Sequence, residues 1–176
     1  MNINIFFTLV SSLLLVILFV FKPLKLDQKE HGIVPLFELS NFSMKELNTN
    51  GLITIMNGTK GTKFTNEYIV KDMDYTDNSK DFLANLKSNT GTYKDDIVNL
   101  VGNVVYFRED GLTFESEEAT YNKKTSIATT RGKYIIYKDK DTVTGTQLVY
   151  NNLMDTVKSK NVNAIYQIKK SNKWKK

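Results

Sequence analysis

The sequence predicts an all-β domain of antiparallel strands that follows a single N-terminal transmembrane helix. Turn signals such as Asn50-Gly51, Asp110-Gly111 and Asn151-Asn152 recur about every 8–14 residues, which is typical of a meander of short strands. The runs between them are rich in Val, Ile, Tyr, Phe and Thr, the residues that favour strands. The third observation is a long uncharged segment at the N-terminus.

This uncharged segment covers residues 3–21. At a rise of about 1.5 Å per residue, a helix of that length crosses a hydrocarbon core of about 30 Å. We expect a short segment at 1–4, then a transmembrane helix at 5–21. A cleaved signal peptide is the alternative, but no basic n-region precedes the segment and no small-x-small cleavage site follows it. The sequence therefore favours an uncleaved anchor.

The rest of the chain divides into a juxtamembrane linker at 22–34, a β-domain at 35–168 and a basic tail at 169–176. Lysines at 22, 25 and 29 follow the helix, and the positive-inside rule would place the domain in the cytoplasm. The net charge of +5 comes from the tail, whose five lysines leave 19 basic and 19 acidic residues in the rest of the chain. A neutral body with isolated arginines argues against a nucleic-acid partner.

The second half of the β-domain repeats with a period of about 29–30 residues. Gly102–Phe107 resembles Gly132–Tyr137, and a third copy follows at Asn161–Tyr166. Such units bury their apolar faces by stacking on one another. Three glycines, Gly102, Gly111 and Gly145, are expected at turns or bulges, with a close backbone approach as a second interpretation of Gly145.

The strands around Val104 and Tyr134 are apolar on both faces, so either both faces are covered or one face binds an apolar ligand. Ordinary core packing is the alternative for each single residue. From the period-two pattern, the candidate lumen residues are Val104, Tyr106, Phe114, Tyr134, Ile136, Val143, Ala164 and Tyr166.

We found no pattern that predicts catalysis. The chain has one histidine, His31, and no cysteine, which excludes catalytic triads and the usual zinc sites. The pairs Asp95-Asp96 and Glu117-Glu118 are neighbours in sequence, so their carboxylates would point to opposite faces of a strand. We therefore expect no enzyme, no metal and no cofactor. Two hypotheses remain: a lipid-handling β-structure, or a membrane-tethered scaffold that recruits partners by edge-strand pairing without carrying lipid.

The order of motifs resembles the LptC family, the inner-membrane subunit of the lipopolysaccharide transport bridge. The motifs are Ile97–Val104, Asp110–Phe114, Thr142–Gly145 with Tyr150-Asn151, and Lys158–Tyr166. The resemblance implies a periplasmic, open and twisted β-jellyroll held at the inner membrane by one helix. That location conflicts with the flanking lysines.

The resemblance also implies a function and partners. The domain would receive lipopolysaccharide from the inner-membrane ABC transporter, whose transmembrane subunits are of the LptF and LptG type, and pass it to an LptA-type bridge protein. A homodimer is left open. The candidate edge-strand residues for partner binding are Leu36, Phe37, Leu39 and Phe42 in an early strand, and Val162, Ala164, Tyr166 and Ile168 in a late one.

Overall fold

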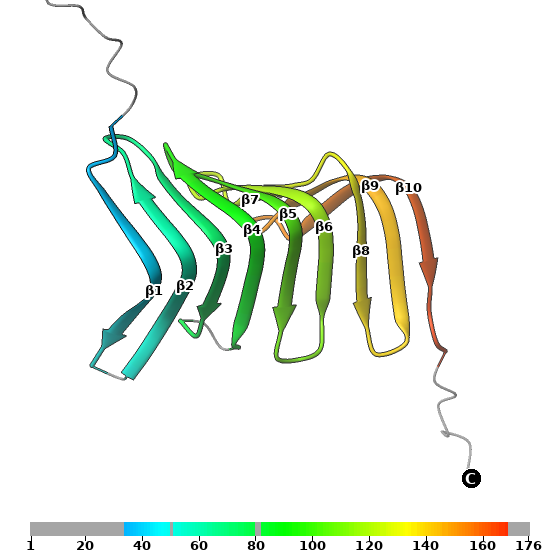
Figure 1. Cartoon of the computed structure of the whole chain (residues 1–176). Helices are drawn as coiled ribbons and strands as arrows, with labels where there is room; N and C mark the ends of the chain where they lie inside the picture. The colour runs from blue at the N-terminus through cyan, green and yellow to red at the C-terminus, as the bar shows by residue number, and fades with distance from the viewer. Residues whose placement is uncertain (1–33, 50, 80–81, 169–176) are drawn as a thin grey trace, which may run out of the picture. The chain divides into compact units, whose positions relative to one another are not determined.

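The computed structural model describes residues 34–49, 51–79 and 82–168. The chain divides after Val34, and Pro35–Lys176 forms the unit that holds the described strands. One antiparallel sheet contains all of them (Figure 1). Its strands are β1 (Phe37–Asn48), β2 (Gly51–Lys63), β3 (Tyr68–Asp77), β4 (Ala84–Lys94), β5 (Ile97–Arg108), β6 (Thr113–Asn122), β7 (Ile127–Thr129), β8 (Lys133–Lys138), β9 (Asp141–Asn151) and β10 (Thr156–Ile165).

The strands follow one another in the sheet in chain order, so the fold is a meander with local pairings. The short strands β7 and β8 together fill one place, between β6 and β9. The end strands β1 and β10 each pair with one neighbour, which leaves two free edges. The predicted all-β antiparallel class is confirmed. Within the described ranges no helix is long and apolar enough to span a membrane, and the predicted anchor at 5–21 lies outside them.

Most strands bend near their middle, and we call the line of bends the crease (Figure 1). A left-handed residue other than glycine lies near the middle of five strands: Asn41, Asp72, Asn103, Gln147 and Asn161. Four of the five are Asn or Asp, whose short polar side chains tolerate this conformation. Polar side chains are joined across neighbouring strands there; for example, Thr59 donates to Asp72 at 2.6 Å. The crease divides the sheet into the lower and upper arms of Figure 1.

The face of the sheet that carries Met73, Leu100 and Val104, here called the inner face, holds the core. These three buried residues form one cluster. Tyr75, Leu86 and Phe114 pack against it from the lower arm, and Val70, Val98 and Ala119 pack against it from the upper arm. The two arms therefore converge at the crease. Few other apolar residues of the described chain are buried: Ala84, Tyr134 and Leu148. The inner face is filled along the crease and open away from it, and we call the space between the arms the trough.

Two Asn- and Gly-containing segments, which by their composition also belong to the series of predicted turns, lie inside strands. Asn57-Gly58 belongs to β2 and Asn89–Gly91 belongs to β4, so these strands are longer than the turn rhythm predicted. The glycines are needed for packing. A Cβ on Gly58 would lie 2.8 Å from Val70, and one on Gly91 would lie 2.6 Å from the sulfur of Met73. In a bent sheet, side chains of one strand cross the backbone of the next, and only glycine leaves room for them.

Candidate functional site

A continuous row of apolar side chains crosses the lower arm on the inner face. Cross-strand pairing links these residues one to the next through nine strands. No member of the row carries a charge. We call it the apolar row: Met44, Met56, Tyr75, Leu86, Tyr106, Phe114, Ile136, Val143 and Ala164.

Five of the eight candidate lumen residues belong to this row, because Tyr106, Phe114, Ile136, Val143 and Ala164 are successive partners across the sheet. The structure thus brings together residues from the three copies of the sequence repeat. Their exposure differs along the row. Tyr106 to Val143 are half-buried, whereas Ala164, on the last strand, is exposed.

The other three candidates lie on either side of the row. Val104 and Tyr134 are at the crease and are buried, with 1% and 5% of their surface exposed, so core packing accounts for both. The Tyr134 ring stacks on Phe114 with centroids 6.2 Å apart, and its hydroxyl donates to Ser159 at 2.8 Å. Tyr166 follows the end of β10 and is 67% exposed.

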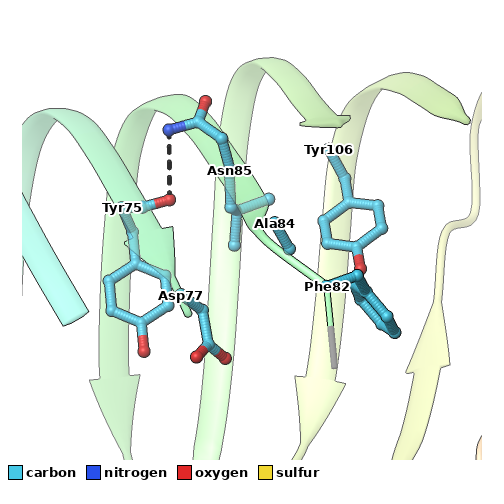
Figure 2. Close-up of a pocket in the computed structure, with 7 residues that line it drawn as sticks. Tyr75, Asp77, Phe82, Ala84, Asn85 and Tyr106 are labelled. Atoms are coloured by element: carbon cyan, nitrogen blue, oxygen red, sulfur yellow. Dashed lines mark hydrogen bonds between the residues drawn. The ribbon is translucent and has the colours of Figure 1, made fainter. Parts of the chain in front are cut away.

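A small hollow opens on the inner face between β3, β4 and β5, with a volume of about 110 Å³. Figure 2 shows the rings of Tyr75 and Tyr106 on its two sides, with Ala84 between them and Phe82 beside Tyr106. Burial raises the pKa of both Tyr75 and Tyr106, so both hydroxyls stay protonated near neutral pH. The hollow is mainly apolar and open to the trough, with Asp77 as its charged group.

Charged side chains hold the outer end of the lower arm. The Asp110 carboxylate accepts hydrogen bonds from Arg108 at 2.6 Å and from Lys138 at 2.7 Å, which ties the β5–β6 turn to the β8–β9 turn. The Arg108 guanidinium lies 4.6 Å above the Phe82 ring. The hydrogen bonds from Arg108 and Lys138 hold the pKa of the Asp110 carboxyl well below its usual range. The end of the arm is thus a fixed polar border beside the apolar row.

A second row crosses the inner face on the upper arm, and four of its members are tyrosines. Cross-strand pairing again runs without a gap from β1 to β10. We call it the tyrosine row: Phe37, Lys63, Tyr68, Tyr93, Val98, Tyr121, Ala128, Tyr150 and Val157. No candidate of the sequence analysis, other than the edge residue Phe37, belongs to it.

The candidate edge residues lie on the two end strands or next to them. Phe37 and Leu39 of β1 are exposed, whereas Phe42 is half-buried over Gly58 and Gly61. Leu36 precedes β1 and donates its backbone N–H to Lys63. On the other edge, Val162 and Ala164 belong to β10, which ends at Ile165. Tyr166 and Ile168 therefore lie after the strand, contrary to the expected late strand at 162–168.

The three candidate glycines have two different roles. Gly102 and Gly111 have positive φ angles of 80° and 88°, at the bulge of β5 and in the β5–β6 turn. Gly145 has no positive φ, and the left-handed residue of β9 is Gln147. Gly145 instead lies under Tyr134, and a Cβ there would be 2.6 Å from the Tyr134 hydroxyl. Close side-chain packing, not a bulge, explains this glycine.

The N-terminal members of the apolar row were missed by the sequence analysis. Met44, Met56, Tyr75 and Leu86 are in strands β1 to β4, which precede the repeat. Their signal was a period-two alternation in Met73-Asp74-Tyr75, but Ile55 and Met56 are adjacent apolar residues that point to opposite faces of β2. Without a repeat to fix the register, this alternation did not show which residues share a row.

A comparison with protein families identifies the chain. The model of the family described as lipopolysaccharide-assembly, LptC-related, matches residues 5–167. The chain belongs to the LptC family. The resemblance seen in the sequence is thereby confirmed. No match was found among the curated proteins.

A solved structure shares the fold of this LptC-family chain. It is LptH of Pseudomonas aeruginosa, the LptA-homologous periplasmic component of the lipopolysaccharide transport device. The two structures align with a TM-score of 0.51 and 14% sequence identity, over 75% of this chain and 94% of the LptH chain. At this identity the similarity concerns the fold, an open β-jellyroll like that of LptA.

Proposed function

We propose that this protein is a non-catalytic lipopolysaccharide-binding component of the transport bridge. In this role it receives lipopolysaccharide from the inner-membrane ABC transporter and passes it to an LptA-type protein. Family membership supports a role in lipopolysaccharide transport. The observation that carries the proposal is the apolar row, which crosses the sheet from one free edge to the other without a charge. Each methylene that such a surface removes from water lowers the free energy by about 0.8 kcal/mol.

We also propose a direction of transfer, which rests on the resemblance to the LptC family and uses the two free edges of the sheet. The β1 edge would meet the periplasmic β-domains of the LptF- and LptG-type transporter subunits, and the β10 edge would meet the LptA-type protein. The domain would then be periplasmic, with residues 5–21 as the inner-membrane anchor. No covalent bond changes when a lipid passes between apolar surfaces, so this domain would need no catalytic residues. The free energy for transport would come from ATP hydrolysis by the transporter. A homodimer formed through either edge would compete with these partners.

Site-specific photo-crosslinking in cells tests the carrier function. A photoreactive residue at Tyr106 or Ile136, in the apolar row, should form a lipopolysaccharide adduct. The matched controls are Phe107 and Ile135, their direct neighbours on the other face of the same strands. We expect adducts at the first two positions and none at the controls. If no position along the apolar row forms an adduct, the carrier function is wrong.

A scaffold without lipid is the second candidate function, and the two free edges favour it. β1 and β10 each expose apolar side chains next to unpaired backbone groups, which suits pairing with a partner strand. Val162→Pro tests this, because Val162 lies in the bulge of β10 and has no paired residue on β9. Loss of partner pull-down together with absent lipopolysaccharide adducts would establish the scaffold. Loss of pull-down with adducts retained would indicate both functions.

A further inference from the structure

The upper wall of the trough differs in chemistry from the lower wall. The apolar row of the lower wall holds seven Met, Leu, Ile, Val, Phe and Ala side chains and two half-buried tyrosines, Tyr75 and Tyr106. The tyrosine row of the upper wall holds twice as many tyrosines, Tyr68, Tyr93, Tyr121 and Tyr150, together with a lysine. Strand propensity does not explain this choice. The adjacent outward-facing row, one residue along each strand, holds no tyrosine: next to the four tyrosines it carries Ile69, Thr92, Thr120 and Val149, which favour strands equally well. The tyrosines are therefore specific to the trough.

The tyrosines are ordered by contacts with one another and with lysines. The rings of Tyr68 and Tyr93 lie 6.2 Å apart. The Lys63 ammonium lies 4.7 Å from the centre of the Tyr68 ring, and the Lys123 ammonium lies 5.2 Å from that of Tyr93. Such cation–π pairs hold the ring faces in place and keep two positive charges at the row.

The hydroxyls at the row divide into two groups. The Tyr93 hydroxyl donates to Asp96 at 3.0 Å, and that of Tyr150 lies 3.2 Å from the Asn152 amide oxygen and 3.4 Å from the Asp155 carboxylate, both of which can accept from it. Among the described residues, the hydroxyls of Tyr68 and Tyr121 have no hydrogen-bond partner. Tyrosine combines an apolar ring with a polar end, which is why it is enriched where an apolar phase meets water. The row thus has the properties of a boundary between acyl chains and a hydrated headgroup.

We propose that the tyrosine row is a binding site for the junction between the acyl chains and the phosphorylated sugar headgroup of a glycolipid. This inference rests on the proposed carrier function. Acyl chains lie in the trough against the apolar row. The sugar lies against the tyrosine rings and hydroxyls, and its phosphate is attracted to Lys63 and Lys123. Because the row runs unbroken from β1 to β10, a moving glycolipid keeps the same depth along the whole sheet.

Mapping which part of the glycolipid touches each wall tests this site. A photoreactive residue is placed in the full chain at Tyr121, in the tyrosine row, or at Phe114, in the apolar row on the same strand β6. After crosslinking to lipopolysaccharide, the protein is digested to peptides, and the part of the glycolipid that stays attached to the labelled peptide is identified by tandem mass spectrometry. The Tyr121 adduct should keep the saccharide, and the Phe114 adduct should keep a fatty acid only.

The outcomes separate this site from the carrier function. A Tyr121 adduct that keeps only a fatty acid, or no adduct at Tyr121 while Phe114 reacts, overturns the tyrosine-row site and leaves the carrier intact. No adduct at either position overturns both. As a second measurement, Tyr121→Phe should lower the affinity for lipopolysaccharide vesicles by about threefold to tenfold, the loss of one hydrogen bond. The same variant should bind phosphatidylglycerol vesicles as the wild type does; an equal loss on both would overturn sugar recognition.

Discussion

The Tyr134 hydroxyl lies 2.6 Å from the position that a Cβ atom would take on Gly145, its pairing partner on β9. The tyrosine side chain therefore crosses the backbone of the neighbouring strand and reaches Ser159 on β10, to which it donates a hydrogen bond. Three adjacent strands are joined by this one side chain. The same arrangement recurs where Met73 lies over Gly91 and where Phe42 lies over Gly61. These contacts between a large side chain and a glycine pack neighbouring strands tightly together along the crease.

Gly145→Ala should destabilise the domain by about 1–3 kcal/mol, because the added methyl forces Tyr134 out of its place in a packed region. Thermal unfolding followed by circular dichroism measures the effect as a fall of several degrees in Tm. Gly132→Ala is the matched control. A Cβ on Gly132 meets no atom within 4 Å, and its φ is not positive. Equal Tm values for the two variants would contradict the packing argument.

Met73→Ala should cost about 2–5 kcal/mol of unfolding free energy, since Met73 is 6% exposed and is part of the buried cluster between the arms. Urea unfolding measures the difference. Met154→Ala serves as the control, because Met154 is 73% exposed in the β9–β10 turn and its truncation should change the free energy by less than about 0.5 kcal/mol. A loss at Met73 no larger than at Met154 would mean that the arms are not held together at the crease.

Asp110→Asn should lower stability near neutral pH and flatten the acid dependence. The pKa of Asp110 is depressed in the folded chain by Arg108 and Lys138, so its contribution is present above the unfolded value of 3.8. That contribution is lost as the pH falls from there toward the folded pKa. Urea unfolding should show that the wild type exceeds Asp110→Asn in unfolding free energy by more at about pH 7 than at about pH 3. As a control, Asp139→Asn, in the β8–β9 turn, should change the unfolding free energy less than Asp110→Asn does at both pH values. If the difference between the wild type and Asp110→Asn is the same at both pH values, the depressed pKa of Asp110 is wrong.

The sequence predicted the class of the fold from signals that are local. Turns at Asp110-Gly111 and Asn151-Asn152 lie where expected, since Gly111 needs a positive φ and Asn151 accepts backbone hydrogen bonds from Leu153 and Met154. The turn at Asp95-Asp96 was not predicted, although both residues have positive φ angles and connect β4 to β5. Asp is a weaker signal than Gly at such positions.

The candidate site was predicted where the repeat fixed the register. Tyr106, Ile136 and Ala164 occur in the three copies and lie in one row. Tyr93 gave no such signal, because it precedes the repeat and because bulges at the crease shift the pairing of β4, β5 and β6. A period-two pattern cannot be carried across a bulge without knowing where it lies.

The last prediction uses two neighbouring residues on opposite faces of β8. Ile136 faces the trough in the apolar row, and Ile135 faces outward between Glu115 and Thr144. Both are half-buried isoleucines, so Asn at either position makes the same chemical change with a similar cost to folding. Ile136→Asn should lower the affinity for lipopolysaccharide about tenfold, because acyl chains lose an apolar contact and meet an amide. Ile135→Asn should bind within about twofold of the wild type when measured on the same vesicles. If the two variants lose affinity equally, the lipid does not distinguish the faces of the sheet, and the trough is not its path.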